Sequence, residues 1–339
     1  MPIGRGTLAA GGPGPCIPRP LRAAVVIPNW NGRGWLDGCL GSVYAQSRPA
    51  DEVIVVDNGS SDGSLELLAE RWPAVRVLAL GVNTGFAAGA NRGVEAARAD
   101  VVALVNTDVE LAGDWLERMV GALELVPGAA AVACKMVDLN DPTLLYDAGD
   151  ILRRDGVCEQ RGRFRADDGR YDEPGEVFAA CAGAAAYRCD AFLAAGGFDE
   201  RFFAYLEDVD LGLRLRLAGW SCRYEPAVAR HAGGGSSGQL ARPVGAWVAR
   251  NTLLMVARSF PVRWLPLVLY RQIAWAWHAA RSGQLRAHVR GLAAALPALP
   301  SMLRERGGLR RRATVPVAAV VPPRAIRGPR AAGHARAES

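Results

Sequence analysis

The feature that most constrains the fold is a regular alternation of short, largely apolar runs with helical patterns. The apolar runs occupy residues 23–28, 52–56, 75–80, 100–105 and 130–134. Runs of this length and composition are typical of strands buried in a parallel sheet. Helical patterns lie between them, at about 34–45, 62–71, 86–98 and 114–125. The alternation predicts an α/β fold with a mostly parallel sheet sandwiched by helices.

The alternation ends after residue 134. Residues 135–177 are charged and contain glycine, which predicts loops with a hairpin. Helices are predicted at about 189–195 and 206–218, followed by a strand near 222–229. We therefore divide the chain into four parts. They are a disordered N-terminal segment (1–20), an α/β domain (21–240), a C-terminal helical region (241–307) and a disordered basic tail (308–339).

Composition narrows the classes of partner. A chain of 339 residues that is 50% hydrophobic can bury a large core. The net charge of +6 is compatible with nucleic acid or anionic lipid, but Lys135 is the single lysine. Arginine-rich usage without lysine is more typical of genome composition than of a binding surface, so we expect no nucleic-acid partner. The seven cysteines include no C-x-x-C pair, and no apolar stretch reaches 18 residues. We expect a cytoplasmic protein without a membrane span.

The stretch "YLEDVDLGLRLRLAGW" (205–220) places three carboxylates in a leucine-rich helical pattern. Acids in such a helix gather at its N-terminal end, where unpaired N–H groups favour negative charge. Asp208 and Asp210 would point roughly 160° apart, so they serve different purposes. Arg214 follows Asp210 at an ion-pair spacing. Asp208 has no such partner, and it is either an N-terminal cap or a functional carboxylate.

Polar loops follow four of the predicted strands. They are "PNWNG" (28–32), "DNGSSDGS" (57–64), "NTGFAAGAN" (83–91) and "NTDVE" (106–110). Each alone is an ordinary turn, but the carboxyl ends of parallel strands meet at one edge of the sheet. Together the loops predict a site for a nucleotide-sized ligand. A dinucleotide fingerprint in "GRGWLDG" (32–38) is disfavoured, because its glycines do not come directly off the strand.

The loop "NTDVE" contains a candidate metal site. Asn106 and Asp108 point the same way in an extended segment, and their oxygens suit a hard divalent cation completed by diphosphate and water. The alternative for this tripeptide alone is a turn at a strand end.

An ordered set of segments resembles a known family. The segments are "VVIPNWNG", "EVIVVDNGSSDGS", "NTGFAAGAN", "LVNTDV", "GGFDERFFAYLEDVDLGLRLRLAGW" and "HAGGGSS". In this order they resemble the family 2 inverting glycosyltransferases with a GT-A fold, in particular the bacterial rhamnosyltransferase-type branch. The resemblance covers about residues 21–240, and it implies a GT-A domain followed by the C-terminal helical extension.

The resemblance also implies roles for individual residues. Asp208 matches the catalytic base, and Asp108 matches the metal-ligating acid, with His231 where the family often has a further ligand. The residues matching the nucleotide-sugar pocket are Pro28, Asn29, Asn31, Asp57, Asn83, Gly85, Asn91 and Asn106. Asn106 stands where the family's motif begins with an acid, so we expect the cation to be held more weakly. The implied cofactor is a divalent metal ion, Mg²⁺ or Mn²⁺.

The implied reaction moves a sugar from a nucleotide-diphospho-sugar to a hydroxyl group of a glycan or lipid-linked acceptor. The resemblance to the rhamnosyltransferase-type branch favours rhamnose as the sugar and dTDP-rhamnose as the donor. Two alternatives remain open. A sugar nucleotidylyltransferase would need a Gly-rich basic loop after the first strand, where the sequence offers only Arg33. A non-catalytic nucleotide-sugar-binding protein would have no need of Asp208.

The helical region after residue 243 suggests where the acceptor lies. Tryptophans at 247, 264, 275 and 277 interleave with arginines, as in a surface that contacts a membrane interface. The alternatives are helices packed on the catalytic domain or a homodimer contact.

Overall fold

A large mixed sheet forms the centre of the protein in the computed structural model, which describes residues 19–233 and 244–323. Residues 1–18, 234–243 and 324–339 lie outside the described residues. The sheet has the central order β10-β12-β6-β11-β4-β1-β2-β3, with β5 and β7 paired at its side. Its strands are β1 (Ala23–Asn29), β2 (Glu52–Asp57), β3 (Arg76–Ala79), β4 (Val101–Val105), β5 (Val109–Leu111), β6 (Ala129–Asp138), β7 (Leu145–Asp147), β10 (Gly175–Val177), β11 (Ala184–Arg188) and β12 (Ser221–His231).

The strand directions confirm a parallel group of strands at the centre of this mixed sheet, whereas β5, β7 and β10 pair antiparallel with their neighbours. β1 pairs in parallel with β2 and β4, β2 with β3, and β6 with β12. β11 lies between β4 and β6 and is antiparallel to both, so these two groups of strands point the same way. β11 itself was not predicted. Its alanine-rich sequence gives no strand period, and its pairing depends on distant parts of the chain.

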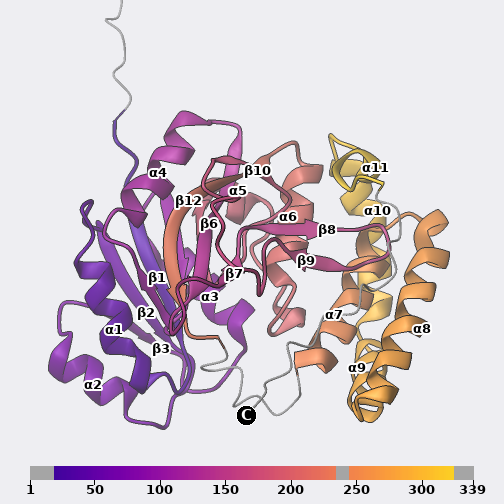
Figure 1. Cartoon of the computed structure of the whole chain (residues 1–339), viewed down its shortest axis with the longest axis horizontal. Helices are drawn as coiled ribbons and strands as arrows, with labels where there is room; N and C mark the ends of the chain where they lie inside the picture. Colours follow the sequence, from indigo (N-terminus) through magenta and orange to yellow (C-terminus); the bar gives the residue numbers. More distant parts are fainter. Residues whose placement is uncertain (1–18, 234–243, 324–339) are drawn as a thin grey trace, which may run out of the picture.

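Helices cover both faces of the sheet (Figure 1), because residues along its central strands alternate between two apolar cores. In β1, Val25 and Ile27 face one core, and Ala24 and Val26 face the other. α1 (Arg33–Tyr44), α2 (Ser64–Arg71) and α4 (Trp115–Leu125) pack on the first face. α3 (Phe86–Ala96), α5 (Cys189–Ala194) and α6 (Glu207–Leu217) pack on the second.

The segment predicted to be loop with a hairpin contains one. β8 (Asp150–Leu152) and β9 (Cys158–Gln160) pair as an antiparallel hairpin outside the main sheet. Its Leu152 packs into a third apolar core, which also contains residues of α6 and of the C-terminal helices. The hairpin therefore joins the sheet domain to the extension.

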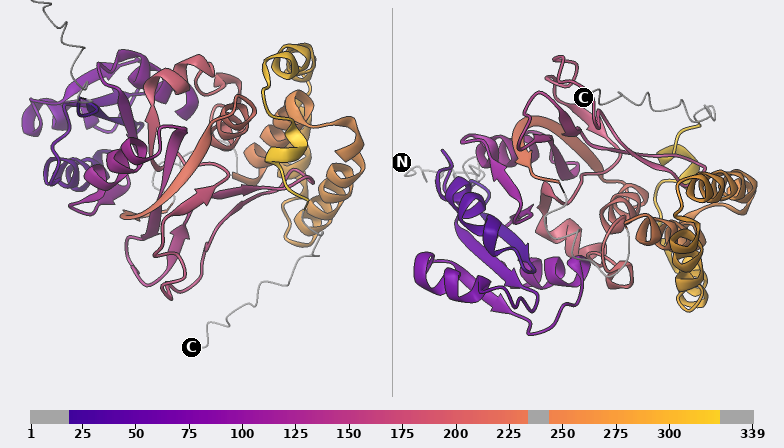
Figure 2. Two further views of the ribbon diagram at one scale, coloured as in Figure 1. Left: turned by 90° about the horizontal axis from the view of Figure 1, so that it is seen from above. Right: turned by 60° about the horizontal axis from the view of Figure 1, so that its bottom comes forward.

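The C-terminal helices form the end of the molecule away from α1 and α2 (Figures 1 and 2). They are α7 (Val244–Ser259), α8 (Leu265–Arg281), α9 (Leu285–Ala295), α10 (Leu299–Arg312) and α11 (Val317–Val320), with the short 3₁₀ turn η3 (Val262–Trp264) between α7 and α8. Another 3₁₀ turn, η1 (Glu200–Phe202), precedes α6. The C-terminal helices are attached to the sheet domain through α6, which is apolar on two sides. Leu211 and Leu215 face the sheet, whereas Val209, Leu213 and Leu217 face α7 and its neighbours. None of the described helices is long and apolar enough to cross a membrane.

One expectation for this region needs correction, and its tryptophans differ in how exposed they are. Disorder was expected from residue 308, but α10 continues to Arg312 and the chain then folds back on α6, where the Thr314 N–H donates to the Leu217 carbonyl (2.8 Å). Apolar Val321, fully buried, fixes this return. Most of the tryptophans proposed for a membrane interface point inward. Trp264 is buried, Trp247 stacks on Phe203 with ring centroids 5.0 Å apart, and only Trp277 is largely exposed.

Candidate active site

The polar loops meet at a cavity of about 770 Å³ at the carboxyl ends of β1 and β4. The start of α6 forms another wall, and α7 and α8 contribute apolar side chains. The predicted site residues that line it are Pro28, Asn29, Asn83, Asn106, Asp108, Asp208 and His231. The structure therefore places the expected metal-binding acid and the expected base on one cavity.

Buried amide side chains brace the loops after β1, β2 and β3. Asn29, the last residue of β1, donates from Nδ2 to Asp57 Oδ2 (2.9 Å). Asn58 follows β2, donates to the Gly85 carbonyl (2.9 Å) and accepts from the Thr84 N–H (2.8 Å). These bonds cross between neighbouring loops, so they fix the shape of the cavity rim before any ligand binds.

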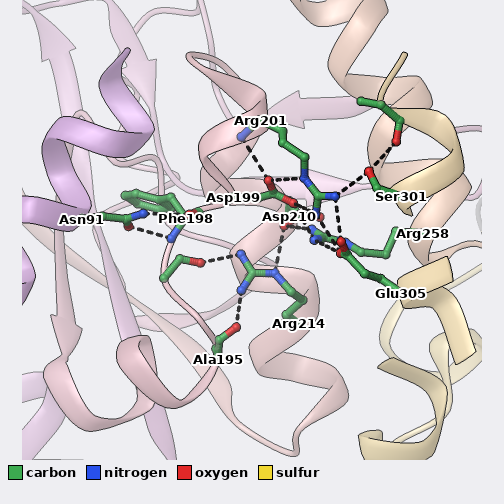
Figure 3. A network of polar contacts seen from close by, with 12 residues as sticks. Asn91, Ala195, Phe198, Asp199, Arg201, Asp210, Arg214, Arg258, Ser301 and Glu305 are labelled. Atoms are coloured by element: carbon green, nitrogen blue, oxygen red, sulfur yellow. Dashed lines mark hydrogen bonds and ion pairs between the residues drawn. The ribbon is translucent and has the colours of Figure 1, made fainter. Parts of the chain in front are cut away.

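Four of the predicted nucleotide-binding residues, all in the described part of the chain, are not among those that line the cavity: Asn31, Asp57, Gly85 and Asn91. The Asn91 side chain donates to the Phe198 carbonyl (2.8 Å) and accepts the Phe198 N–H (2.9 Å) (Figure 3). These bonds hold the chain before α6, and a contact of Asn91 with a ligand stays a prediction. Gly85 has φ +91°, and a Cβ there would lie 2.6 Å from the Phe203 ring. Asp57 is buried behind Asn29, and its contact with a base stays a prediction.

Strand pairing brings Asp108 and His231 together. β12 pairs with β5 so that His231 lies opposite Val109, beside Asp108. His231 Nε2 lies 3.5 Å from Asp108 Oδ1, and the Tyr146 ring packs on the imidazole with centroids 4.3 Å apart. Burial lowers the pKa of His231, which favours the neutral ring that can ligate a metal.

The charge of the cavity fits a divalent cation. Five carboxyl groups line it in the described part of the chain, from Asp108, Asp138, Asp150, Glu207 and Asp208. Arg163 is the sole arginine or lysine among the described lining residues. The described residues include no group of three His, Cys, Asp or Glu side chains that could hold a metal by itself. Asp108 and His231 could thus supply only part of a coordination shell, with diphosphate oxygens and water supplying the rest.

One hydrogen bond determines which nitrogen of the His231 ring carries the proton, and so how the ring could bind a metal. The Gly233 N–H donates to His231 Nδ1 (2.8 Å), so in the neutral ring the proton sits on Nε2, facing Asp108. Ligation through Nε2 requires the proton to move to Nδ1 and the Gly233 N–H to move away.

Asp208 is the second residue of α6 and is half-buried in the cavity wall. Its Oδ2 accepts the Ala182 N–H (3.0 Å), and its Oδ1 accepts the Val209 N–H (2.8 Å). The N-cap position belongs to Leu206, so the capping alternative for Asp208 is wrong. Burial raises the pKa of Asp208, and the two N–H groups partly oppose this shift. A carboxylate with raised pKa in a cavity is suited to accept a proton.

The backbone before Asp208 has an unusual conformation. Phe203, Tyr205 and Leu206 have φ values of +64°, +71° and +65°. Non-glycine residues adopt this region at a cost, so the surroundings must hold it. Asn251 of α7, fully buried, directs its side-chain nitrogen at the carbonyls of Phe202, Ala204 and Tyr205, at 3.0, 2.9 and 2.7 Å. A residue of the extension therefore positions the segment that leads into Asp208.

A buried ionic network fixes the other side of α6. Arg214 donates to Asp210 Oδ2 (2.9 Å), which confirms the ion pair expected from their spacing. Arg258 of α7 binds the same oxygen and also lies 2.7 Å from Asp199 (Figure 3). Asp210 is fully buried, so this network ties α6 to α7 through charge-assisted bonds.

Sequence reasoning missed two buried acids next to the site. Burial raises the pKa of Asp147 to about 7 and raises that of Asp150, and the nearby Asp208 adds to both shifts. Gln160 donates to Asp147 (3.1 Å), and Asp150 lines the cavity. The signal was present in "LLYDAGDIL", where two acids interrupt an apolar stretch.

Comparison with known proteins identifies the family. Residues 24–194, half of the chain, match the family described as Glycosyl transferase family 2. The chain belongs to this family. This glycosyltransferase is 34% identical over 205 residues to the N-acetylglucosaminyl-diphospho-decaprenol L-rhamnosyltransferase of Mycobacterium tuberculosis. That alignment covers 54% of this chain and 66% of the relative. The O-antigen biosynthesis protein RfbC of Myxococcus xanthus is 26% identical over 58% of this chain and 16% of its own length.

Solved structures identify the fold of this glycosyltransferase as GT-A. GalNAc-T7, crystallised with UDP, GalNAc and Mn²⁺, aligns over 71% of this chain and 48% of its own, with a TM-score of 0.57 and 15% identity. The mannosyltransferase PcManGT of Pyrobaculum calidifontis, in complex with GDP-Man and Mn²⁺, aligns over 85% of this chain and 80% of its own. Its TM-score is 0.50 and its identity 19%. Membership of the family disfavours the nucleotidylyltransferase alternative.

Proposed function

We propose that this protein transfers a sugar from a nucleotide-diphospho-sugar to a hydroxyl group of a cell-envelope glycan, with inversion at the anomeric carbon. The observation that carries the proposal is the position of Asp108 and Asp208 on one cavity at the carboxyl edge of the sheet. One carboxylate lies where the loops after β1 and β4 can cradle a nucleotide diphosphate. The other lies across the cavity, where an acceptor hydroxyl can approach from the apolar side formed by α7 and α8.

Asp208 acts as general base in this proposal. Its carboxylate accepts the proton of the acceptor hydroxyl while that oxygen attacks the anomeric carbon from the face opposite the diphosphate. General-base catalysis of this kind contributes roughly 10²–10⁴-fold to rate. The Ala182 and Val209 N–H groups orient the carboxylate, and their hydrogen bonds favour its ionised form against the effect of burial on its pKa.

Asp108, with His231, would hold a Mg²⁺ or Mn²⁺ ion at the diphosphate end of the donor. The bound ion would supply Lewis-acid stabilisation of the leaving diphosphate. Arg163 also lines the cavity and brings a second positive charge toward that group. Asn29, Asn83 and Asn106 would orient the nucleotide through hydrogen bonds.

As the sugar donor we propose dTDP-rhamnose, and as the acceptor a lipid-linked glycan. The support is the 34% identity to a mycobacterial protein named as a rhamnosyltransferase that acts on a diphospho-decaprenol-linked sugar. The test is to incubate the full chain with a panel of nucleotide sugars and a short-chain lipid diphosphate carrying N-acetylglucosamine. Transfer from dTDP-rhamnose, with inverted anomeric configuration by NMR, is expected. Transfer from another sugar would revise the donor, and retained configuration would overturn the mechanism.

Asp108→Ala tests the diphosphate site. Because Asp108 lies in a turn at the cavity, the variant should fold normally but lose metal-dependent binding of thymidine diphosphate, measured by calorimetry with and without Mn²⁺. Glu110→Ala is the matched control, since Glu110 lies two residues on and outside the cavity lining. If Asp108→Ala binds with unchanged affinity and unchanged metal dependence, the assignment is wrong.

A further inference from the structure

The outer face of α8 is apolar although it packs on nothing in the described structure. Leu265, Leu269, Tyr270, Ile273 and Trp277 are between 42% and 67% exposed. At 100° per residue they occupy an arc of roughly 140° on one side of the helix. The opposite side carries buried Val268 and Ala279 and also Trp275, which lines the active-site cavity. α8 is therefore amphipathic with its larger apolar side chains facing outward, the reverse of a helix that serves only to cover a core.

α9, the next helix along the chain, has an exposed apolar stripe of its own with a basic border. Leu285, Val289 and Leu296 are between 40% and 61% exposed and lie within roughly 40° of each other around the helix. Arg286 and Arg290 are exposed along one side of that stripe. α9 packs against α8 and α7, so the two apolar stripes belong to neighbouring helices at the end of the molecule (Figures 1 and 2).

α8 and α9 carry charge of one sign. The sequence contains no aspartate or glutamate from residue 226 to residue 304. Arg250, Arg258 and Arg271 point inward and bind groups of the protein. Arg263, Arg281, Arg286 and Arg290 are exposed, and none of the ion pairs found among the described residues involves them. Large apolar side chains bordered by unneutralised arginines are the composition of a helix that lies in a membrane interface.

We propose that the outer face of α8 and α9, defined by the residues above, binds the surface of an anionic lipid membrane. The apolar side chains enter the boundary between headgroups and acyl chains, and the arginines contact lipid phosphates. The binding is peripheral and reversible. Trp275 and Trp277 lie on opposite sides of α8, so the active-site cavity lies about one helix diameter, roughly 10 Å, from the proposed membrane plane.

Charge favours lipid over a second copy of the chain. A twofold interface would place the same patch on both sides, and so would bring two sets of these arginines together without any acid between them. An anionic membrane supplies the missing negative charge.

Vesicle flotation of the full chain tests this proposal without any measure of activity. Vesicles of phosphatidylcholine with phosphatidylglycerol should carry the protein, vesicles of phosphatidylcholine alone should carry much less, and added salt should release it. Leu269→Ser combined with Ile273→Ser should lower the affinity about tenfold or more. Leu125→Ser, at an 84% exposed leucine of α4, is the matched apolar control and should bind as wild type.

The charge contribution is tested separately. Arg286→Gln combined with Arg290→Gln should weaken binding to anionic vesicles and reduce its salt dependence, whereas Arg165→Gln, in the loop after β9, should change neither. Unchanged melting temperatures show that each variant folds. Equal flotation of all variants would overturn the proposal. So would a concentration-dependent dimer that the same serine substitutions dissociate, without vesicle binding, because it would show that this face joins two copies.

Discussion

Asp208 combines two properties that a single substitution can separate. It accepts hydrogen bonds from two backbone N–H groups, and it presents a carboxylate of raised pKa to the cavity. Asparagine has nearly the same shape and can still accept a hydrogen bond, but it cannot take up a proton. The residue therefore offers a direct test of the proposed chemistry.

Asp208→Asn should lower the rate of sugar transfer by about two orders of magnitude or more, with donor affinity near that of wild type. The measurement is initial rate and donor Kd, together with melting temperature. In wild type the rate should also fall on acidification at a higher pH than for an exposed aspartate, because burial raises the pKa of Asp208. A variant that keeps more than about a tenth of the wild-type rate, a loss of only about 1.4 kcal/mol, would exclude the general-base role.

Asp147 should make stability depend on pH. Burial raises its folded-state pKa to about 7, whereas an aspartate in an unfolded chain titrates near pH 4. Between these values the folded protein holds a proton that the unfolded chain has lost. The free energy of unfolding should therefore fall as pH rises from about 4 to about 7. Asp147→Asn should flatten this slope, as measured by urea unfolding at several pH values, and parallel curves for the two proteins would contradict the prediction.

Helices and strands that have a clear apolar period could be predicted from the sequence, whereas the three-residue strands could not. The sequence located β1, β2, α1 and α4 to within one or two residues, because each has a period long enough to recognise. It also placed the loops after β1 and β4 at one rim, since parallel strands end together. β7, β8, β9 and β10 have three residues each, too few to show alternation. Their acids, Asp147 and Asp150, were missed for the same reason. The position of β11 between β4 and β6 depends on contacts between distant parts of the chain, which no local sequence pattern indicates.

Asp210, two residues after Asp208, connects α6 to the neighbouring helix α7. Its Oδ2 binds Arg214 within α6 and Arg258 of α7, in a site without solvent. Asp210→Asn leaves two buried guanidinium groups short of negative charge, so it should cost about 3 kcal/mol of stability and lower Tm by several degrees. Glu176→Gln is the control, because Glu176 is 57% exposed and its pair with Arg216 should contribute less than about 1 kcal/mol. Equal shifts in Tm for the two variants would show that the network does not hold α6 to α7.

At the scale of the whole molecule, the extension is part of the fold and not an appendage. α7 and its neighbours bury Val209, Leu213 and Leu217 of α6, and the chain after α10 returns to the end of that helix. A protein ending at residue 233 should therefore expose this apolar side of α6 and be insoluble or partly unfolded. The measurement is soluble yield and circular dichroism. A protein ending at residue 323 keeps every contact described above and is the control. A stable, cooperative fold for the shorter chain would show that the sheet domain is autonomous.

Asn251 has a consequence for building chimeras between related enzymes. Its amide lies in α7, yet it holds the backbone that leads into Asp208. A catalytic domain joined to the extension of another enzyme should keep Asp208 in place only if the incoming helix carried an amide at the matching position. An aspartate there would fit the space but would turn an oxygen toward three carbonyl oxygens. Such a hybrid could retain its nucleotide pocket and still be inactive, and restoring one asparagine in the foreign helix should recover turnover.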